Sequence, residues 1–361
     1  MYKRINGLQH VGVGVPNHAE SWKWYRKFFG MDIAMFNGEA EAPLMQIYTK
    51  GDIINKRAAM ILNLQGGLAM EVVSPVSFTA TDADVSFELG DLGIFIAQIK
   101  SPDVEKTFKW FKENTRLPDG QGADVIGEMQ ELPYGGKTFY LKDPNGLLFQ
   151  VIPGGGWYTK LRHVTGGPVG STVGVTDIDK ALTLYADLLG YDKIIFDETA
   201  VFDDWKNTVS GGDKTFRRVR LAQSNKPGGG FAKVMADTYI ELAQAINYTP
   251  KKIYADRLWG DIGFVHLGFD VRGMKELGKD LAEKGFGFTC DTEDTLDMGG
   301  TTRVHCTYIE DPDGTLIELI EVYKIPIIEK LGIFLNLENR DPLKPLPDFM
   351  LKALRFGRIK D

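Results

Sequence analysis

Apolar and polar residues alternate in short stretches along most of the chain, and glycine-rich turns separate these stretches. Residues 8–15 read Leu-Gln-His-Val-Gly-Val-Gly-Val, so the valines share one side of an extended strand while His10 and both glycines share the other. Residues 265–271 repeat the pattern, with Val, Leu, Phe and Val on one side and His266 on the other. The alternation predicts two equivalent strands, each with an apolar side and a histidine side.

Segments with helical periodicity follow these strands. Apolar residues spaced by three or four positions, such as Trp22, Tyr25 and Phe29, predict a helix with one buried side. Asn17, three residues before Glu20, is typical of a helix N-cap with a capping box. Three strand-like runs come after each predicted helix. Strand–helix openings of this kind occur at residues 8–29, 93–114, 169–189 and 263–284.

Two sets of residues recur along the chain at nearly constant offsets. The string Tyr-Leu-Lys-Asp-Pro-Asn-Gly at 140–146 returns as Tyr-Ile-Glu-Asp-Pro-Asp-Gly at 308–314, an offset of 168. The string Val-Gly-Val at 13–15 returns at 173–175, an offset of 160. Proline, Asn or Asp, and glycine in succession favour a tight turn between two strands. The two halves of the chain are therefore related to each other.

These repeats predict an α+β fold of four βαβββ modules, in two related halves that form curved mixed sheets. The N-terminal half spans 1–155 with modules at 5–80 and 88–155, and the C-terminal half spans 165–323 with modules at 165–247 and 258–323. The Pro- and Gly-rich stretch 153–168 is the predicted linker. Residues 324–361 lie outside the repeat, and we expect them to form an arm over the core, with a helical stretch at 348–356.

Composition and charge narrow the class of protein. The chain has 42 Lys and Arg against 49 Asp and Glu, a net charge of −7 with no basic run, which argues against a nucleic-acid partner. No apolar stretch reaches the roughly 18 residues of a membrane helix, and the first residues lack the apolar core of a signal peptide. Two cysteines exclude a disulfide framework. We expect a cytoplasmic protein whose partner is a small molecule.

A polar residue interrupts the last strand of every module at an equivalent position. These residues are Glu71, Gln150, Glu241 and Glu318. A carboxylate inside an apolar strand is costly to bury unless it is paired or binds a metal. One such residue could lie on an exposed strand edge, but three carboxylates at one position favour a common role in binding.

The order of these motifs resembles the vicinal oxygen chelate superfamily, which includes glyoxalase I, methylmalonyl-CoA epimerase, bleomycin-resistance proteins and extradiol dioxygenases. The resemblance covers about residues 5–323 and rests on the His-x-Gly strand, the helix with tyrosine, and the Asp-Pro-(Asn/Asp)-Gly turn followed by a strand with Glu. In this superfamily two modules close a cup around one divalent metal ion. The resemblance implies that each module supplies ligands from its first and last strands.

Two pairings of the modules are possible, and they predict different sites. If modules one and four pair, as in single-chain glyoxalases, one cup holds His10, Glu71, His266 and Glu318, and modules two and three form a degenerate cup with Gln150 and Glu241. If consecutive modules pair, as in extradiol dioxygenases, the C-terminal cup holds Glu241, His266 and Glu318. We prefer the first pairing because it places both histidines in one site.

The expected ligands indicate which metals could bind and which type of reaction the site could catalyse. Imidazole and carboxylate ligands with open positions suit Zn, Ni, Co, Mn or Fe(II). The resemblance implies a glyoxalase-type lyase, isomerase or epimerase, in which the metal binds two adjacent oxygens of a small substrate and stabilises an enolate. Glu71 or Glu318 would then move a proton at the neighbouring carbon.

Two other functions stay open. One is an Fe(II)-dependent, ring-cleaving dioxygenase of the extradiol type, which would need a histidine near Gly170 on the first strand of module three. The other is a non-catalytic protein that binds a small molecule, like the drug-resistance proteins, in a cup without metal. Arg303 and His305 share one side of a predicted strand and could bind an anionic substrate. The chain is expected to be a monomer or a homodimer.

Overall fold

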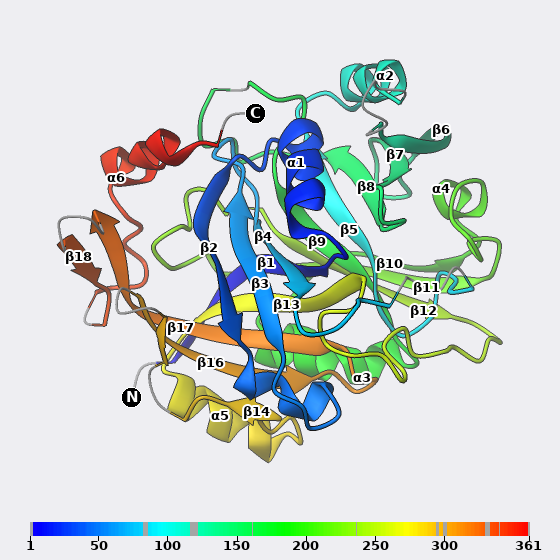
Figure 1. Ribbon diagram of the computed structural model, residues 1–361. Coiled ribbons are helices and arrows are strands. Elements are labelled where there is room, and N and C mark those ends of the chain that lie inside the picture. The colour runs from blue at the N-terminus through cyan, green and yellow to red at the C-terminus, as the bar shows by residue number, and fades with distance from the viewer. Residues whose placement is uncertain are drawn as a thin grey trace.

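The protein has an α+β architecture built on two curved mixed sheets (Figure 1). The computed structural model describes residues 3–81, 86–115, 122–160, 162–235, 237–293, 296–298, 302–328, 333–338 and 340–359. None of the helices in these ranges is long and apolar enough to cross a membrane.

The four modules follow one another in the order expected from the sequence repeats. The first comprises β1 (Arg4–Gly14), α1 (His18–Phe29), β2 (Ile33–Glu41), the 3₁₀ helix Pro43–Tyr48, β3 (Asn55–Leu62) and β4 (Ala69–Pro75). The second comprises β5 (Gly93–Ser101), α2 (Val104–Glu113), β6 (Asp124–Glu131), β7 (Lys137–Lys142) and β8 (Leu148–Pro153).

The C-terminal half repeats this order with additions. The third module comprises β9 (Pro168–Gly174), α3 (Ile178–Leu182) with a π-helical continuation (Thr183–Leu188), β10 (Lys193–Ala200), α4 (Asp203–Lys206), β11 (Phe216–Ala222) and β12 (Tyr239–Ala245). The fourth comprises β13 (Gly263–Arg272), α5 (Met274–Glu283), β14 (Cys290–Asp291), β15 (Leu296–Met298), β16 (Thr302–Glu310) and β17 (Leu316–Ile328).

Each sheet joins modules from both halves of the chain. In the first sheet, β1 pairs antiparallel with β13, so modules one and four share the order β14-β16-β17-β13-β1-β4-β3-β2. In the second sheet, β5 pairs antiparallel with β9, so modules two and three share the order β10-β11-β12-β9-β5-β8-β7-β6. The preferred pairing of modules one and four is confirmed. Within the described residues the first sheet has ten strands, because β15 also pairs with β16 and β18 (Ile333–Asn336) also pairs with β17. The division into domains at 155, 165 and 323 stays a prediction.

The strands separate an inner core from two concave faces. Val11 and Val13 are fully buried in a large cluster that also holds residues of α1, α2, α3 and α5, so the apolar sides of both sheets meet the helices. His10 and Glu71 lie on the other, concave side of the first sheet, where they face Glu318 and His266. The alternation in the sequence therefore predicted the two sides of β1 correctly.

The helix α1 begins and ends where its sequence indicates. The Asn17 side chain accepts hydrogen bonds from the backbone of Ala19 and Glu20, and Gly30 ends the helix in the left-handed conformation. Its buried side packs an aromatic group, Trp22, Trp24, Tyr25, Phe28 and Phe29, into the inner core.

The repeated Asp-Pro-x-Gly turns connect neighbouring modules. Asp143 accepts hydrogen bonds from the backbone N–H of Asn145 and Leu147 within its own turn, and its second oxygen accepts the Tyr25 hydroxyl of α1 at 2.7 Å. The turn in the C-terminal half does the same, because the Tyr185 hydroxyl donates to Asp311 at 3.0 Å. Burial raises the pKa of both aspartates to about 6. The repeated Tyr and Asp residues thus form the same hydrogen bond between modules in both halves of the chain.

The C-terminal segment packs beside the first sheet, with β18 next to β17 and α6 (Asp348–Ala353) near β2 (Figure 1). β17 extends past residue 323, where the sequence repeat ends, and pairs with β18. The predicted helical stretch is present as α6 followed by the 3₁₀ turn Leu354–Gly357. Leu346 and Leu351 are buried in a cluster with residues of β2 and β3.

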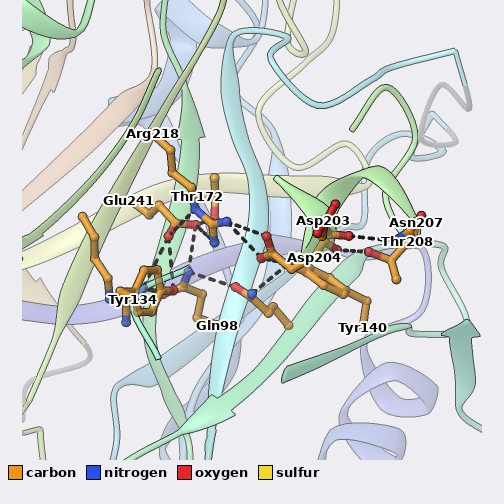
Figure 2. Close-up of polar contacts among 12 residues, drawn as sticks. Gln98, Tyr134, Tyr140, Thr172, Asp203, Asp204, Asn207, Thr208, Arg218 and Glu241 are labelled. Carbon is orange, nitrogen blue, oxygen red and sulfur yellow. Dashed lines mark hydrogen bonds and ion pairs between the residues drawn. The ribbon is translucent and has the colours of Figure 1, made fainter. Parts of the chain in front are cut away.

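Charged side chains fill the concave face of the second sheet (Figure 2). The guanidinium group of Arg218, on β11, lies between two buried carboxylates and is itself fully buried. Its Nη1 is 2.9 Å from both carboxylate oxygens of Asp204, and its Nε is 3.0 Å from Glu241 Oε2. Burial opposes ionisation of Glu241, but Arg218 and Arg220 hold its pKa below the usual value.

Neutral side chains and a second arginine complete this network. Gln98 donates to Gln150 and to Glu241, and Gln150 donates to the Tyr140 hydroxyl. Arg220 Nη1 donates to Gln98 at 2.9 Å and to the Tyr134 hydroxyl at 3.0 Å. The charges of two cations and two carboxylates therefore balance within this cup. The cup is occupied by side chains of the chain itself.

This network predicts a large effect of removing its central cation. Arg218→Ala should lower the free energy of unfolding by about 3–5 kcal/mol, because two buried carboxylates lose their counter-charge. The neighbouring Arg217 is the matched control, since it pairs with Asp197 and Asp179 at the surface, and Arg217→Ala should cost about 1 kcal/mol or less. Urea unfolding followed by tryptophan fluorescence measures both. Equal effects of the two substitutions would contradict the argument.

Candidate metal centre

Two histidines and two glutamates converge on the concave face of the first sheet. They are the pair on β1 and β4, His10 and Glu71, and the pair on β13 and β17, His266 and Glu318. One ligand atom of each residue lies within 4.8 Å of the corresponding atoms of the other three. The structure therefore brings together all four residues that the sequence singled out as metal ligands.

The ligand atoms form a tight, nearly enclosed group. The two Nε2 atoms of the histidines are 2.9 Å apart. Glu318 Oε2 is 3.1 Å from His10 Nε2 and 3.5 Å from His266 Nε2, while Glu71 Oε2 is 3.3 Å from His266 Nε2 and 4.0 Å from His10 Nε2. Both histidines are fully buried, and the glutamates are 6% and 8% exposed.

Glycines make room for the two imidazole rings. In the β1–β13 register His10 faces Gly268, and Gly12 faces His266, so the two His-x-Gly motifs are reciprocal. A Cβ atom at Gly12 would overlap the His266 ring, and a Cβ atom at Gly268 would overlap the His10 ring. Both glycines are therefore required for the rings to meet at the centre of the sheet.

Hydrogen bonds around the cluster orient its ligands. Gln9 Oε1 lies 3.2 Å from His10 Nδ1. Because an amide oxygen only accepts, Nδ1 donates, and the lone pair of Nε2 points to the other ligands. Glu318 accepts the hydroxyl of the buried Tyr308 at 2.9 Å, which leaves its other oxygen for the histidines.

Glu71 has a different environment from Glu318. Lys56 Nζ on β3 lies 3.5 Å from Glu71 Oε1 and 4.7 Å from the centre of the Trp259 ring. Burial opposes ionisation of Glu71, but the charge of Lys56 and the hydrogen bond with His266 hold the pKa of this carboxyl below its usual range. A third group in this region, the Cys306 thiol, has a raised pKa because of its partial burial and the two carboxylates.

The donor set fits a divalent metal ion. Two carboxylates and an imidazole lone pair face one another, and few donors of the chain itself compensate them. Such a group is costly to bury unless a cation satisfies it. The two imidazole nitrogens and two carboxylate oxygens are also a set that Zn, Ni, Co, Mn and Fe(II) accept.

The structure does not bring Arg303 and His305 to this cluster. Along β16, Tyr308 reaches Glu318, so residues of the other parity lie on the opposite side of the strand. On that side Thr307 contacts Met274 of α5, and His305 Nε2 lies 2.7 Å from Asp291 Oδ1.

Sequence reasoning missed Lys56, Trp259 and Tyr308 as residues near the cluster. Tyr308 lies directly opposite Glu318 in the β16–β17 register, so strand parity could have identified it. No motif marks Lys56 or Trp259, because they reach the cluster through the packing of β3 against a distant loop.

The second cup has no counterpart of the histidines. Glu241 and Gln150 occupy the positions of the two glutamates, as the sequence predicted. The registers place Gly170 and Ile96 where the first cup has histidine, the latter two residues from the expected position. Thus the second sheet keeps the strand arrangement but replaces the metal ligands with the network around Arg218.

Comparisons with known proteins agree with this architecture. No model of a protein family and no curated protein matches the chain in sequence. Among solved structures, glyoxalase I from Zea mays has a TM-score of 0.52 and 16% identity, covering 89% of this chain and 92% of that one. A mutant of the same enzyme gives a TM-score of 0.53, with the same identity and coverage. A candidate dioxygenase from Bacillus subtilis has a TM-score of 0.51 and 14% identity, covering 89% and 86%.

These likenesses extend over all four modules and confirm, at the level of the fold, the resemblance that the sequence motifs indicated. The chain has the fold of glyoxalase I.

Proposed function

We propose that the protein is a metal-dependent enzyme that transfers a proton on a small substrate with two adjacent oxygens, as an isomerase, epimerase or lyase. The observation that carries the proposal is the convergence of His10, Glu71, His266 and Glu318 in a nearly enclosed cup. One divalent ion held by these residues would act as a Lewis acid that binds both substrate oxygens and stabilises the charge that develops on them.

The two glutamates would have different tasks. Glu318 is fixed on both sides, by the Tyr308 hydroxyl at 2.9 Å and by His10 at 3.1 Å. Glu71 has longer contacts on both sides, 3.5 Å to Lys56, whose side chain is 21% exposed, and 3.3 Å to His266. Because Glu71 is held less firmly, it is the better candidate to leave the ligand group and accept a proton from the substrate carbon. Glu318 would remain a ligand.

The enclosed position of the site supports this chemistry. Exclusion of water strengthens the electrostatic effect of each fixed group and protects a reactive carbanion from unwanted protonation. The described residues give the cup apolar surroundings, including Ala58, Val73 and Val265. A small substrate fits such a site better than a polymer does.

The ring-cleaving dioxygenase is the alternative that we favour less. It would pair consecutive modules and use a histidine on the first strand of module three, whereas β1 pairs with β13 and that position is Gly170. Oxygen uptake by the Fe(II)-loaded protein with catechol tests it directly. The non-catalytic binding protein is tested by the metal content described next.

Metal content tests the ligand set. The wild-type chain should hold about one Co(II) or Zn(II) per molecule after loading and dialysis, because the second cup has no comparable ligands. His266→Ala and Glu318→Gln should each weaken binding by at least about 100-fold, since loss of a mere supporting partner already costs 10–100-fold. His163→Ala is the control, because His163 pairs with Asp32 away from the cup. Mass spectrometry of the metal measures all four proteins, and a wild-type chain without metal would end the enzyme proposal.

The glycines give an independent test that leaves every ligand in place. Gly268→Ala should weaken metal binding by roughly tenfold or more, because the added methyl group displaces the His10 ring from the centre. Gly38→Ala is the matched control, since Gly38 also lies in a strand of this sheet but has open space around it. Calorimetric titration with Zn(II) compares the two variants. Equal affinities would show that the close approach of the rings does not determine binding.

Substitution of Glu71 tests the base. Glu71→Gln should retain most of the metal but slow proton exchange by about 10²–10⁴-fold, the usual contribution of a general base. The probes are dihydroxyacetone and glyceraldehyde in D₂O, and NMR follows deuterium incorporation beside the carbonyl group. Exchange at the wild-type rate would assign the base to Glu318 instead.

A further inference from the structure

A lysine and a tryptophan lie in contact with each other next to Glu71 of the metal cluster. The Lys56 ammonium lies 4.7 Å from the centre of the Trp259 ring and 3.5 Å from Glu71 Oε1. Trp259 is 2% exposed and belongs to the apolar cluster on the concave face of the first sheet. The aromatic face holds the long lysine side chain in place and reduces the entropy it would lose on binding a ligand.

Both residues have hydrogen-bond donors to spare. Among the residues that the structure describes, the Trp259 Nε1–H is buried without a partner. In the same part of the chain, Glu71 is the one hydrogen-bond acceptor within reach of Lys56 Nζ, which carries three N–H groups. A buried donor without a partner is costly, so a ligand with an acceptor oxygen would relieve a penalty that the protein alone leaves in place.

The charges of the centre indicate what kind of ligand this is. Glu71 and Glu318 balance the two charges of a divalent ion, and the histidines add none as neutral ligands. Lys56 then leaves the site with one positive charge in excess. A ligand with a single negative charge restores the balance in a place where an unbalanced charge is expensive.

From this geometry we propose that the substrate is a small monoanion, a carboxylate that carries an oxygen on the adjacent carbon, and that Lys56 and Trp259 bind its negatively charged group. The inference rests on the proposed function, because the same ligand must reach the metal. Lys56 therefore acts as a substrate-binding residue that selects charge, in addition to its contact with Glu71.

Two ligands of almost identical shape test the contribution of the negative charge of the ligand to binding. Glycolate and its neutral analogue glycolamide both present two adjacent oxygens, and they differ by one negative charge. Each is titrated into the full chain loaded with Co(II), whose visible absorption bands report binding at the metal. The variants are Lys56→Met, which keeps most of the length but loses the charge, Lys56→Arg, which keeps the charge, and Trp259→Phe, which loses the N–H together with one of the two fused rings.

Lys56→Met should weaken glycolate binding by about tenfold or more, the loss expected for one charge-assisted hydrogen bond, and leave glycolamide within about twofold. Lys56→Arg should retain most of the glycolate affinity, and Trp259→Phe should lose about threefold. Arg57→Met is the matched control, since Arg57 is the next residue on β3 but pairs with Glu39 at the surface. Arg57→Met should change the affinity for neither ligand.

The affinity for Co(II) itself separates this role from a structural one. Removing a cation beside Glu71 should leave metal binding unchanged or make it tighter, so a Lys56→Met protein that loses both metal and glycolate contradicts the inference. An unchanged ratio of glycolate to glycolamide affinity in a fully loaded Lys56→Met protein overturns the inference alone. A wild-type chain that takes up no Co(II) overturns the proposed function, and the inference with it.

Discussion

The antiparallel pairing of β1 with β13 is the constraint on which the candidate site depends. This register sets each His-x-Gly motif against the other, so that each ring occupies the space above the opposite glycine. A shift by one residue would turn both histidines to the apolar side of the sheet. Since β4 and β17 pair in parallel with these two strands, Glu71 and Glu318 are carried to the same point. The four ligand atoms therefore follow from one strand register.

The two cups show two ways to bury the same carboxylate. In both, a glutamate on the last strand of a module points into a concave, water-poor face, where an isolated charge is very costly. The second cup contains its own cation, because Arg218 fixes a guanidinium group between Glu241 and Asp204. The first cup has Cys306 at the position of Arg218, opposite the residue two beyond the glutamate, and its own cation, Lys56, contacts only Glu71. The side chains of the second cup thus neutralise one another, whereas in the first cup the proposed metal ion would neutralise the two glutamates.

The sequence predicted the features that repeat or alternate, and it failed for those that depend on packing between distant segments. Strand parity and the spacing of motifs identified the fold and the four clustered residues, because both are local properties of the chain. The same parity argument was insufficient for Arg303 and His305, since it shows that two residues share a side of β16 but not which side faces the cup. Lys56 approaches Glu71 and Trp259 only once β3 and the loop before β13 have packed together. Nothing in the local sequence of Lys56 or Trp259 predicts this contact.

The four modules are joined in a closed ring, and this explains how so small a site can be held in register. Sheet hydrogen bonds join module one to module four and module two to module three. The Tyr25–Asp143 pair joins modules one and two, and the Tyr185–Asp311 pair joins modules three and four. Each module is therefore fixed by two neighbours, so β1 and β13 cannot slide past each other without breaking contacts on the far side of the molecule. The Asp-Pro-x-Gly turns lie outside the metal cluster, yet they limit the motion of the strands that carry its ligands. A centre whose histidine nitrogens lie 2.9 Å apart requires such a frame, because a displacement of about one ångström is enough to disrupt a preorganised site.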